Sequence, residues 1–345
     1  MTRRGPTSRR EAPLANGFML DAPMYPLRFH PILKRLIWGG RRLGAFLDKP
    51  LGDEHDYAES WEIADHRRDV SVVADGPLAG ANLRDLLAAR GAEILGCAGG
   101  EARQFPLLVK FLDAHRVLSV QVHPDDAKGR VLADDNGKTE AWIVLHAEPG
   151  SLIYAGLRAG VSRADLADAM EAGRVEPLLH RFAARPGDCV MIPAGTIHAI
   201  GAGIVLAEIQ QMSDATFRVD DWGRLGPDGV PRPLHAREAL EATDFEAGPV
   251  NPVRPDASRI TNGTRERLAS CDYFAIERLT LQGPAEVGTR DRFTIVLGLD
   301  GDCEVVHDGR PVLLAKGQTR LLPAALGPCE VRPLQCATIL TCVVP

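Results

Sequence analysis

The side chains best suited to chemistry lie in residues 118–140, which read LSVQVHPDDAKGRVLADDNGKTE. Apolar and polar residues alternate in the first half of this segment. A strand here would place three polar side chains on one face: those of Ser119, Gln121 and His123. Lys138 and Glu140 are two residues apart and would also share a face of an extended chain. Together these residues supply an imidazole, a carboxylate, an amide and an amine, which is the inventory of a metal site with an acid–base partner.

A second polar element ends at His198. The segment GDCVMIPAGTIH, which begins at Gly187, predicts a strand over residues 189–192 that ends at a tight Pro–Gly turn. Such a turn would direct His198 back into the mouth of a β-barrel. The spacing Gly-x5-Pro-x-Gly-x2-His resembles the second motif of the cupin superfamily at each fixed position. The first cupin motif is altered, because Gln121 stands where its first histidine would be.

Length and composition exclude several classes of protein. With 345 residues, of which 45% are hydrophobic and 25% charged, the chain is long enough for two domains and typical of a soluble globular protein. A formal net charge of −6 disfavours nucleic acid as a partner. No run approaches the roughly 18 apolar residues of a membrane-spanning helix, so we expect neither a signal peptide nor a membrane partner. The seven cysteines form no CxxC pair, which indicates a reduced, cytoplasmic protein.

The order of short strands and turns predicts a mainly β protein. Before the C-terminal third we expect strands at 59–63, 70–74, 105–112, 142–154 (two strands around a turn), 189–192 and 205–210. One helix is expected over 83–89, and another begins with a capping box at Ser162 and ends by Phe182. Residues 127–136 are expected to form a loop, and 251–262 an inter-domain connection. From Tyr273 onwards the pattern is of short strands only: 274–281, 293–299, 303–306, 312–314, 319–322 and 337–343.

An internal repeat accounts for the length of the chain. PGDCVMIPAGTIH, which ends at His198, aligns with KGQTRLLPAALGP at an offset of 130 residues. Residues 143–145 align with residues 295–297 at an offset of 152, and a helix inserted near 162–180 accounts for the difference. In this alignment Pro328 replaces His198 and Arg292 replaces Glu140. We therefore expect two cupin-like jelly-roll β-barrels. The first carries the polar residues of a candidate site, the second lacks them, and a few helices are inserted in the N-terminal part.

The chain resembles the type I mannose-6-phosphate isomerases, in their short bacterial form. The motifs that carry this resemblance are Trp38-Gly39-Gly40, Glu59-Ser60-Trp61-Glu62, residues 105–110, 118–126 and 137–140, Pro193 to Ala199, and Glu208 to Trp222. The resemblance extends from about residue 25 to the C-terminus, and its central motifs QVHPDD, GKTE and PAGTIHA are specific. Residues 1–23 are polar and contain Gly and Pro, so we expect a flexible segment there. After it we expect a catalytic cupin domain over 24–250 and a C-terminal cupin-like domain over 251–345 without metal ligands.

The resemblance also implies roles for single residues. One zinc ion per chain would be held by His123, Glu140 and His198, with Gln121 either as a fourth ligand or as an amide that orients the substrate. Iron and manganese also suit such ligands. Arg218 is the expected active-site cation, although Phe217 stands where the family often has tyrosine. We assign proton transfer to Lys138, with a carboxylate as the rival.

The remaining assignments concern the substrate and its handling. Lys110 and Ser119 are expected to bind the phosphate of a phosphorylated hexose, while Glu208 and Asp214 would support the metal site. The implied enzyme is a metal-dependent aldose–ketose isomerase that interconverts mannose 6-phosphate and fructose 6-phosphate through an enediol(ate), as a monomer or homodimer. Two alternatives share the fold: a sugar-binding or regulatory cupin without turnover, and an iron-dependent cupin dioxygenase.

Overall fold

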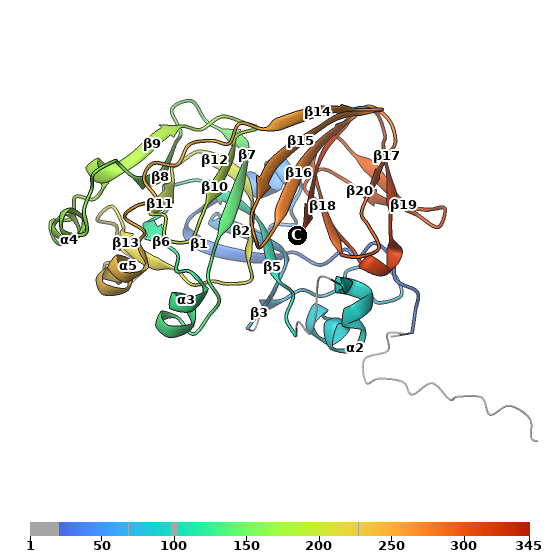
Figure 1. Ribbon diagram of the computed structural model, residues 1–345, viewed down its shortest axis with the longest axis horizontal. Coiled ribbons are helices and arrows are strands. Elements are labelled where there is room, and N and C mark those ends of the chain that lie inside the picture. The colour runs from blue at the N-terminus through green and yellow to red at the C-terminus, as the bar shows by residue number, and fades with distance from the viewer. Residues whose placement is uncertain (1–20, 68, 98–102, 227) are drawn as a thin grey trace, which may run out of the picture.

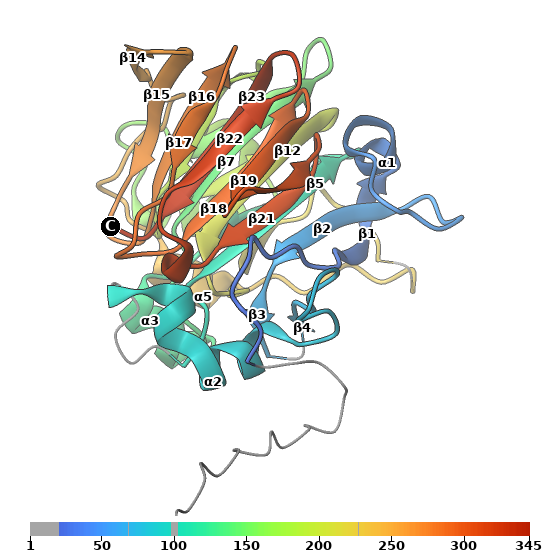
Figure 2. The same ribbon diagram turned by 90° about the vertical axis from the view of Figure 1, so that its right-hand side faces the viewer.

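A computed structural model describes residues 21–67, 69–97, 103–226 and 228–345 (Figure 1). Most of the expected flexible segment, 1–23, lies outside the described residues. The chain folds into four large antiparallel sheets and one two-stranded sheet. These sheets stack as two sandwiches, sheets 1 and 2 in one and sheets 3 and 4 in the other (Figures 1 and 2). No helix among the described residues has the length and apolarity needed to span a membrane.

The first sandwich contains sheets 1 and 2. In spatial order, sheet 1 consists of β1 (Ile32–Gly40), β2 (Tyr57–Ile63), β5 (Leu107–Ala114), β12 (Ile204–Gln211), β7 (Glu140–Ala147) and β10 (Cys189–Ile192). Sheet 2 consists of β13 (Phe217–Asp220), β6 (Val120–Val122), β11 (His198–Ile200), β8 (Leu152–Leu157) and β9 (Leu179–Ala183). A small sheet pairs β3 (Asp65–His66) with β4 (Asp69–Val70).

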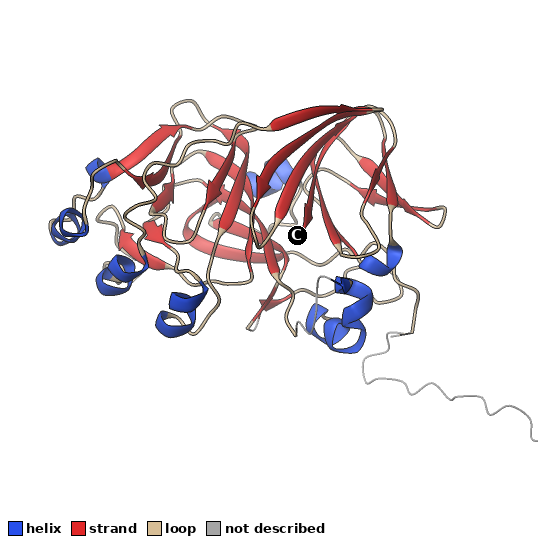
Figure 3. Cartoon of the chain, viewed as in Figure 1, coloured by secondary structure: helices blue, strands red, loops and turns tan. Residues whose placement is uncertain are grey.

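The second sandwich contains sheets 3 and 4. Sheet 3 consists of β14 (Asp256–Ile260), β15 (Gly263–Ser270), β16 (Ala275–Leu281), β23 (Ala337–Val343), β18 (Thr294–Asp300) and β21 (Thr319–Leu322). Sheet 4 consists of β17 (Ala285–Val287), β22 (Cys329–Pro333), β19 (Cys303–His307) and β20 (Arg310–Leu314). The helices are α1 (Arg42–Leu47), α2 (Leu83–Leu95), α3 (Asp126–Leu132), α4 (Arg163–Glu171) and α5 (Ala236–Ala242), with short 3₁₀ turns at Glu176–Leu178 and Ala324–Leu326 (Figure 3).

Three apolar cores hold these layers together. The largest joins the outer face of sheet 1 to the second sandwich, through residues such as Phe111, Ile143 and Ile276. A second lies between sheets 1 and 2 and includes Trp142 and Ile153. The third packs sheet 2 against α4 and α5. Sheet 1 is therefore buried on both faces, which explains why β5, β7 and β12 read as apolar runs interrupted by a few polar residues.

The mainly β fold of two jelly-roll-like sandwiches is confirmed, and β10, β21 and β23 have the predicted bounds. The capping box at Ser162 is also present, since its hydroxyl and the Asp165 carboxylate bond reciprocally to backbone N–H groups. The helix it begins ends at Glu171, before the predicted limit at Phe182, and the helix expected near 162–180 is shorter because β9 covers 179–183. Gly173 follows with a φ of 61°, a left-handed conformation that suits glycine and stops the helix.

Three further expectations were wrong in detail. Residues 126–132 form helix α3, capped by the Asp125 side chain, where a loop was expected. Only Val70 of the expected strand 70–74 belongs to a strand, the two-residue β4. The expected connection 251–262 contains β14, the edge strand of sheet 3. The boundary between domains at residue 250 stays a prediction.

The strand pairing supports the repeat and corrects its alignment. Strands β2-β5-β12-β7-β10 of sheet 1 occur in the same order as β15-β16-β23-β18-β21 of sheet 3. Ile192, before the Pro–Gly turn, pairs with Glu140, while its equivalent Leu322 pairs with Thr294. The counterpart of Glu140 is therefore Thr294, and the alignment with Arg292 was wrong by two residues. An ungapped match of three apolar residues cannot detect such a shift, because a shift of two keeps every side chain on its face.

Candidate active site

Three potential metal ligands converge between sheets 1 and 2. His123 follows β6, Glu140 begins β7, and His198 begins β11. The Nε2 atoms of His123 and His198 lie 3.6 and 3.5 Å from the two carboxylate oxygens of Glu140. One ligand atom from each residue lies within 4.8 Å of the others, and none of the three residues is more than 1% exposed. The predicted ligands are thus brought together from three separate strands.

Backbone carbonyls fix the tautomer of both histidines. Nδ1 of His123 lies 2.9 Å from the carbonyl oxygen of Ala215, and Nδ1 of His198 lies 2.8 Å from that of Thr196. A carbonyl only accepts a hydrogen bond, so each Nδ1 must donate and carry the proton. Each Nε2 then carries a lone pair, the state in which neutral imidazole binds a metal, and that of His123 lies 3.0 Å from Lys138 Nζ.

Electrostatics favour the same protonation states. Burial lowers the pKa of His198 to about 3, and the neighbouring His123 adds to that effect. Burial, assisted by Lys138, also lowers the pKa of His123. For Glu140 burial acts in the opposite sense, but the ammonium of Lys138 holds the pKa of this carboxyl well below its usual range. Two neutral imidazoles therefore face an ionised carboxylate.

These residues fit a metal ion on structural grounds. His198 Nε2 and Oε1 of Glu140 are buried and have no hydrogen-bond partner among the described residues. Buried polar atoms are normally satisfied, and an orphaned lone pair indicates a missing ion or water. Two nitrogens and a carboxylate that leave a coordination position open are the donor set of catalytic zinc sites.

Sheet 2 places Gln121 and Arg218 beside these ligands. Gln121 in β6 pairs across the sheet with His198 in β11, and on its other side with Arg218 in β13. Side chains of directly paired residues lie on the same face, so all three share the face that carries the site. Gln121 and Arg218 are half-buried, whereas the three potential ligands are fully buried.

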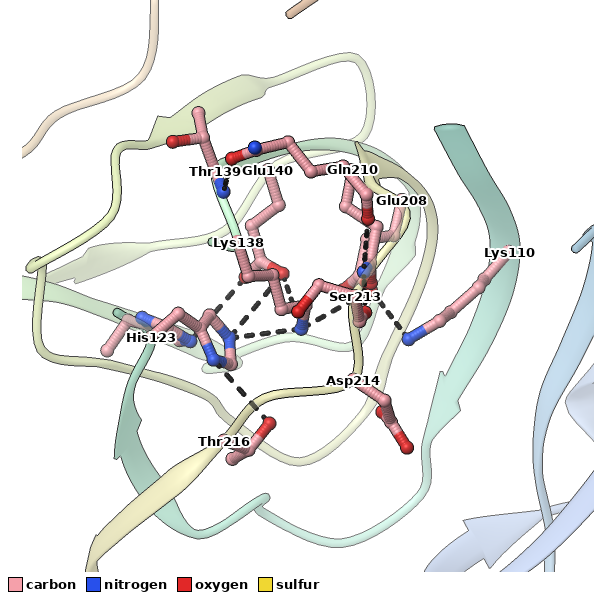
Figure 4. A network of polar contacts seen from close by, with 12 residues as sticks. Lys110, His123, Lys138, Thr139, Glu140, Glu208, Gln210, Ser213, Asp214 and Thr216 are labelled. Carbon is pink, nitrogen blue, oxygen red and sulfur yellow. Dashed lines mark hydrogen bonds and ion pairs between the residues drawn. The ribbon is translucent and has the colours of Figure 1, made fainter. Parts of the chain in front are cut away.

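Lysines and carboxylates alternate along the other side of the site (Figure 4). Lys138 Nζ lies 2.8 Å from Glu140 and 3.0 Å from His123 Nε2. Glu208 then joins the two lysines, with its Oε1 at 4.0 Å from Lys138 Nζ and 3.2 Å from Lys110 Nζ. Lys110 in turn lies 3.8 Å from Glu59 and 5.1 Å above the ring of Trp61. The network runs from the three potential metal ligands across sheet 1 to Glu59 in β2.

Within this network the surroundings favour the charged form of Lys110 but disfavour the charged form of Glu208. Burial disfavours the ammonium of Lys110, but the carboxylates of Glu59 and Glu208 outweigh burial and raise its pKa above the usual value. The pKa of Glu208 is raised, first by burial and then by the nearby charge of Glu140. Trp142 donates its indole N–H to Glu208 at 3.1 Å and meets the ring of His198 edge-on. Glu208 therefore has a fixed position and a weakened preference for ionisation.

Three successive backbone N–H groups, those of residues 137–139, donate hydrogen bonds that fix the backbone around Lys138. Gly137 donates to the Asp126 carboxylate at 2.9 Å, Lys138 to the carbonyl of Pro124 at 2.9 Å, and Thr139 to the Gln211 side chain at 2.8 Å. A Cβ at Gly137 would approach the backbone of Asp126 to 2.4 Å, so only glycine fits this contact.

Asp126 also connects this clamp to the second sandwich. Its carboxylate accepts a bond from Gln211 at 3.0 Å and one from the Tyr273 hydroxyl at 2.8 Å. The two sandwiches thus meet in a chain of hydrogen bonds that ends at the backbone carrying Lys138 and Glu140.

Not every predicted residue occupies the expected place. Lys110 is only 3% exposed and forms buried ion pairs, so it does not lie at an exposed rim, and its role in binding phosphate stays a prediction. Ser119 is buried directly before β6, and its role in binding phosphate also stays a prediction. Sequence reasoning gave no role to Trp142 and named Glu59 only as part of a motif, although Glu59 is a polar interruption of an apolar strand. Tyr273 carried no local signal at all.

Comparisons with known proteins agree with this geometry. A family model described as phosphomannose isomerase type I, catalytic domain, matches residues 27–156, and one described as mannose-6-phosphate isomerase, cupin domain, matches residues 264–343. Mannose-6-phosphate isomerase ManA of Bacillus subtilis is 33% identical over 305 residues, which cover 88% of this chain and 94% of the relative. The mannose-6-phosphate isomerase of Streptococcus mutans is 33% identical over 298 residues, covering 86% and 92%.

Solved structures give the same result. The crystal structure of mannose 6-phosphate isomerase from Bacillus subtilis superposes with a TM-score of 0.84 at 30% identity, covering 92% of this chain and 99% of that one. A mannose 6-phosphate isomerase bound with zinc and yttrium shares the fold, with a TM-score of 0.72 at 18% identity over 91% and 98% of the two chains. On these matches and its buried His–Glu–His site, the chain belongs to the type I mannose-6-phosphate isomerase family.

Proposed function

We propose that this protein interconverts mannose 6-phosphate and fructose 6-phosphate, using one zinc ion per chain held by His123, Glu140 and His198. The observation that carries the proposal is the convergence of two Nε2 lone pairs and an ionised carboxylate in a buried site with an adjacent lysine. Solved relatives include a zinc-bound mannose 6-phosphate isomerase, which favours zinc over other divalent ions.

The metal would act as a Lewis acid that stabilises negative charge on the sugar oxygens during enolisation. The residues of this chain supply the remaining functions. The Ala215 and Thr196 carbonyls keep both imidazoles in the ligating tautomer. Gln121, on the same sheet face as His198, would complete the ligand set or orient the substrate with its neutral amide.

Isomerisation moves a proton between C1 and C2 of the sugar, so a positioned acid–base group is required. We assign this proton to Lys138 Nζ, which contacts both Glu140 and His123 and whose backbone is clamped on either side. Glu208 is the carboxylate rival, because its raised pKa and its place between two lysines suit proton exchange.

Arg218 provides the positive charge for the enediolate or the phosphate. None of the ion pairs among the described residues includes it, and its Nε is buried without a partner. Its Nη1 donates to the carbonyl of Pro233 at 2.7 Å, which leaves the rest of the guanidinium for an anionic ligand. We place the enzyme in the cytoplasm, where its free cysteines would stay reduced.

The deciding experiment is a coupled assay for fructose 6-phosphate formed from mannose 6-phosphate. It is run with chelator-treated protein, before and after addition of zinc. We expect turnover that the chelator abolishes and zinc restores. Absence of turnover in protein that demonstrably contains zinc would reject this substrate pair, and full turnover without bound metal would reject the metal-assisted mechanism.

A further inference from the structure

The second sandwich contains a cavity at the position that corresponds to the active site. The cavity has a volume of about 630 Å³ and lies between sheets 3 and 4, and none of the candidate site residues lines it. Its charged lining consists of Arg265, Arg267, Arg292, Glu277 and Glu286, and Thr294 lies among them. A volume of this size accommodates a hexose phosphate.

Strand register relates this lining to the active site. Thr294 is the counterpart of Glu140, and Arg292 precedes it by two residues as Lys138 precedes Glu140. Lys110 pairs with Glu208 and Trp61 in sheet 1, and in sheet 3 Glu277 pairs in the same way with Thr341 and Arg267.

One more pair extends the correspondence to the neighbouring strand. Glu59 pairs with Leu112 in sheet 1, and Arg265 pairs with Leu279 in sheet 3. Arg265, Glu277, Arg292 and Thr341 all line the cavity, so the cavity contains the equivalents of most of the active-site network.

The replacements reverse the charge of the site. Three carboxylates of the first sandwich, Glu59, Glu140 and Glu208, correspond to an arginine and two threonines in the second. The cavity lining contains two carboxylates, those of Glu277 and Glu286, beside three arginines, so its net charge is positive and disfavours a cation. Arginine and threonine are instead the donors that proteins use for phosphate, through bidentate and hydroxyl hydrogen bonds.

Unused donors remain in the cavity lining. The hydroxyl of Thr294, a residue only 2% exposed, is buried without a hydrogen-bond partner among the described residues. Arg265 and Arg292 have acidic neighbours, Glu277 at 3.5 Å and Asp291 at 3.0 Å, and Arg267 is the arginine of the lining that forms no ion pair among the described residues.

We propose that this cavity is a second, metal-free binding site for a small phosphorylated ligand, in which Arg267, Arg292 and Thr294 contact the phosphate. The ligand is either a phosphorylated sugar or inorganic phosphate, and both share the chemistry that the cavity recognises. The proposal does not depend on isomerase activity, since it concerns binding in the other sandwich.

The test is a calorimetric titration of the full-length protein carrying His198→Ala, which disables the metal site. Inorganic phosphate and fructose 6-phosphate are titrated separately in the presence of chelator. We expect saturable binding that Thr294→Val and Arg267→Met each weaken by about 10-fold, because each removes a hydrogen bond or charge from the ligand. Thr294→Val preserves the shape of a buried residue, and Arg267 is exposed, so both variants should fold.

Arg259→Met serves as the matched control, since Arg259 lies in β14 of the same sheet, is exposed and does not line the cavity. It should leave the affinity unchanged. Tighter binding of fructose 6-phosphate assigns the site to a sugar phosphate, and equal binding assigns it to the phosphate group alone. Absence of binding, or binding that neither cavity variant weakens, would overturn the proposal whatever the outcome of the isomerase assay.

Discussion

The two sandwiches share a strand order but differ in what their inner faces carry. β7 and β10 of the first correspond to β18 and β21 of the second, with the same pairing around a Pro turn. In the first, Glu140 faces two histidines, whereas in the second Thr294 faces a cavity lined with arginine. Backbone hydrogen bonds and alternate apolar residues maintain the strand framework in both. The inner polar side chains can therefore change without loss of the fold, and they alone separate a metal site from its counterpart.

The largest effect is expected when Glu140 of the first sandwich is replaced by threonine, the residue found at the equivalent position, Thr294, in the second. Glu140→Thr should remove the ligand carboxylate, lower zinc affinity, and reduce kcat/KM by about 10³-fold or more, because several kcal/mol of charge stabilisation is lost with the metal. Metal content by mass spectrometry and the coupled assay measure both effects. Glu171→Thr, at the exposed end of α4, is the matched control and should behave as wild type. Wild-type turnover in Glu140→Thr would exclude this carboxylate from the site.

A second exchange separates charge from proton transfer. Arg292 stands in the second sandwich where Lys138 stands in the first, and arginine keeps its proton at all physiological pH values. We expect Lys138→Arg to retain zinc but to lower kcat by about 10²- to 10⁴-fold, the usual contribution of a general acid–base group.

Glu208→Gln, assayed alongside Lys138→Arg, distinguishes the rival assignment. If Lys138→Arg retains most of kcat while Glu208→Gln loses it, then Glu208 carries the proton. The rate at which the C2 proton of the sugar exchanges with solvent deuterium, followed over time, provides an independent measure of this step.

The smallest expected effect concerns the contact between the sandwiches. Tyr273→Phe keeps the ring but removes the hydroxyl bonded to Asp126, and so loosens the clamp on the backbone of Lys138. We expect kcat to fall by about 3- to 10-fold with little change in KM, since one hydrogen bond contributes roughly 1 kcal/mol. Amide hydrogen exchange in a peptide covering residues 137–139 should increase.

Tyr25→Phe is the matched control, because it removes a hydroxyl bonded to Asp75 and Leu78, neither of which belongs to the site. In an Asp126→Ala background, Tyr273→Phe should have no further effect on kcat if it acts through Asp126. Additive losses in the double variant would contradict this path.

Much of the fold could be predicted because its signals are local. Alternating or continuous apolar runs bounded by Gly and Pro identified β10, β21 and β23 with their observed bounds. Elements stabilised by tertiary contact were missed. Helix α5 has seven residues and buries Ala239 and Ala242 against sheet 2, so its stability comes from packing more than from its own sequence.

The sequence by itself determined the chemical inventory of the site: two histidines, a glutamate, a lysine and an arginine in motifs that read at fixed spacing. Tertiary structure decided the rest. The fold set the histidine tautomers through the carbonyls of Ala215 and Thr196. It also brought Glu208 within reach of both lysines. In the second sandwich it paired Thr294, and not Arg292, with β21, the strand that corresponds to β10. These relations depend on the register between strands distant in the chain, and register is fixed by the summed burial of whole strands, which no short motif contains.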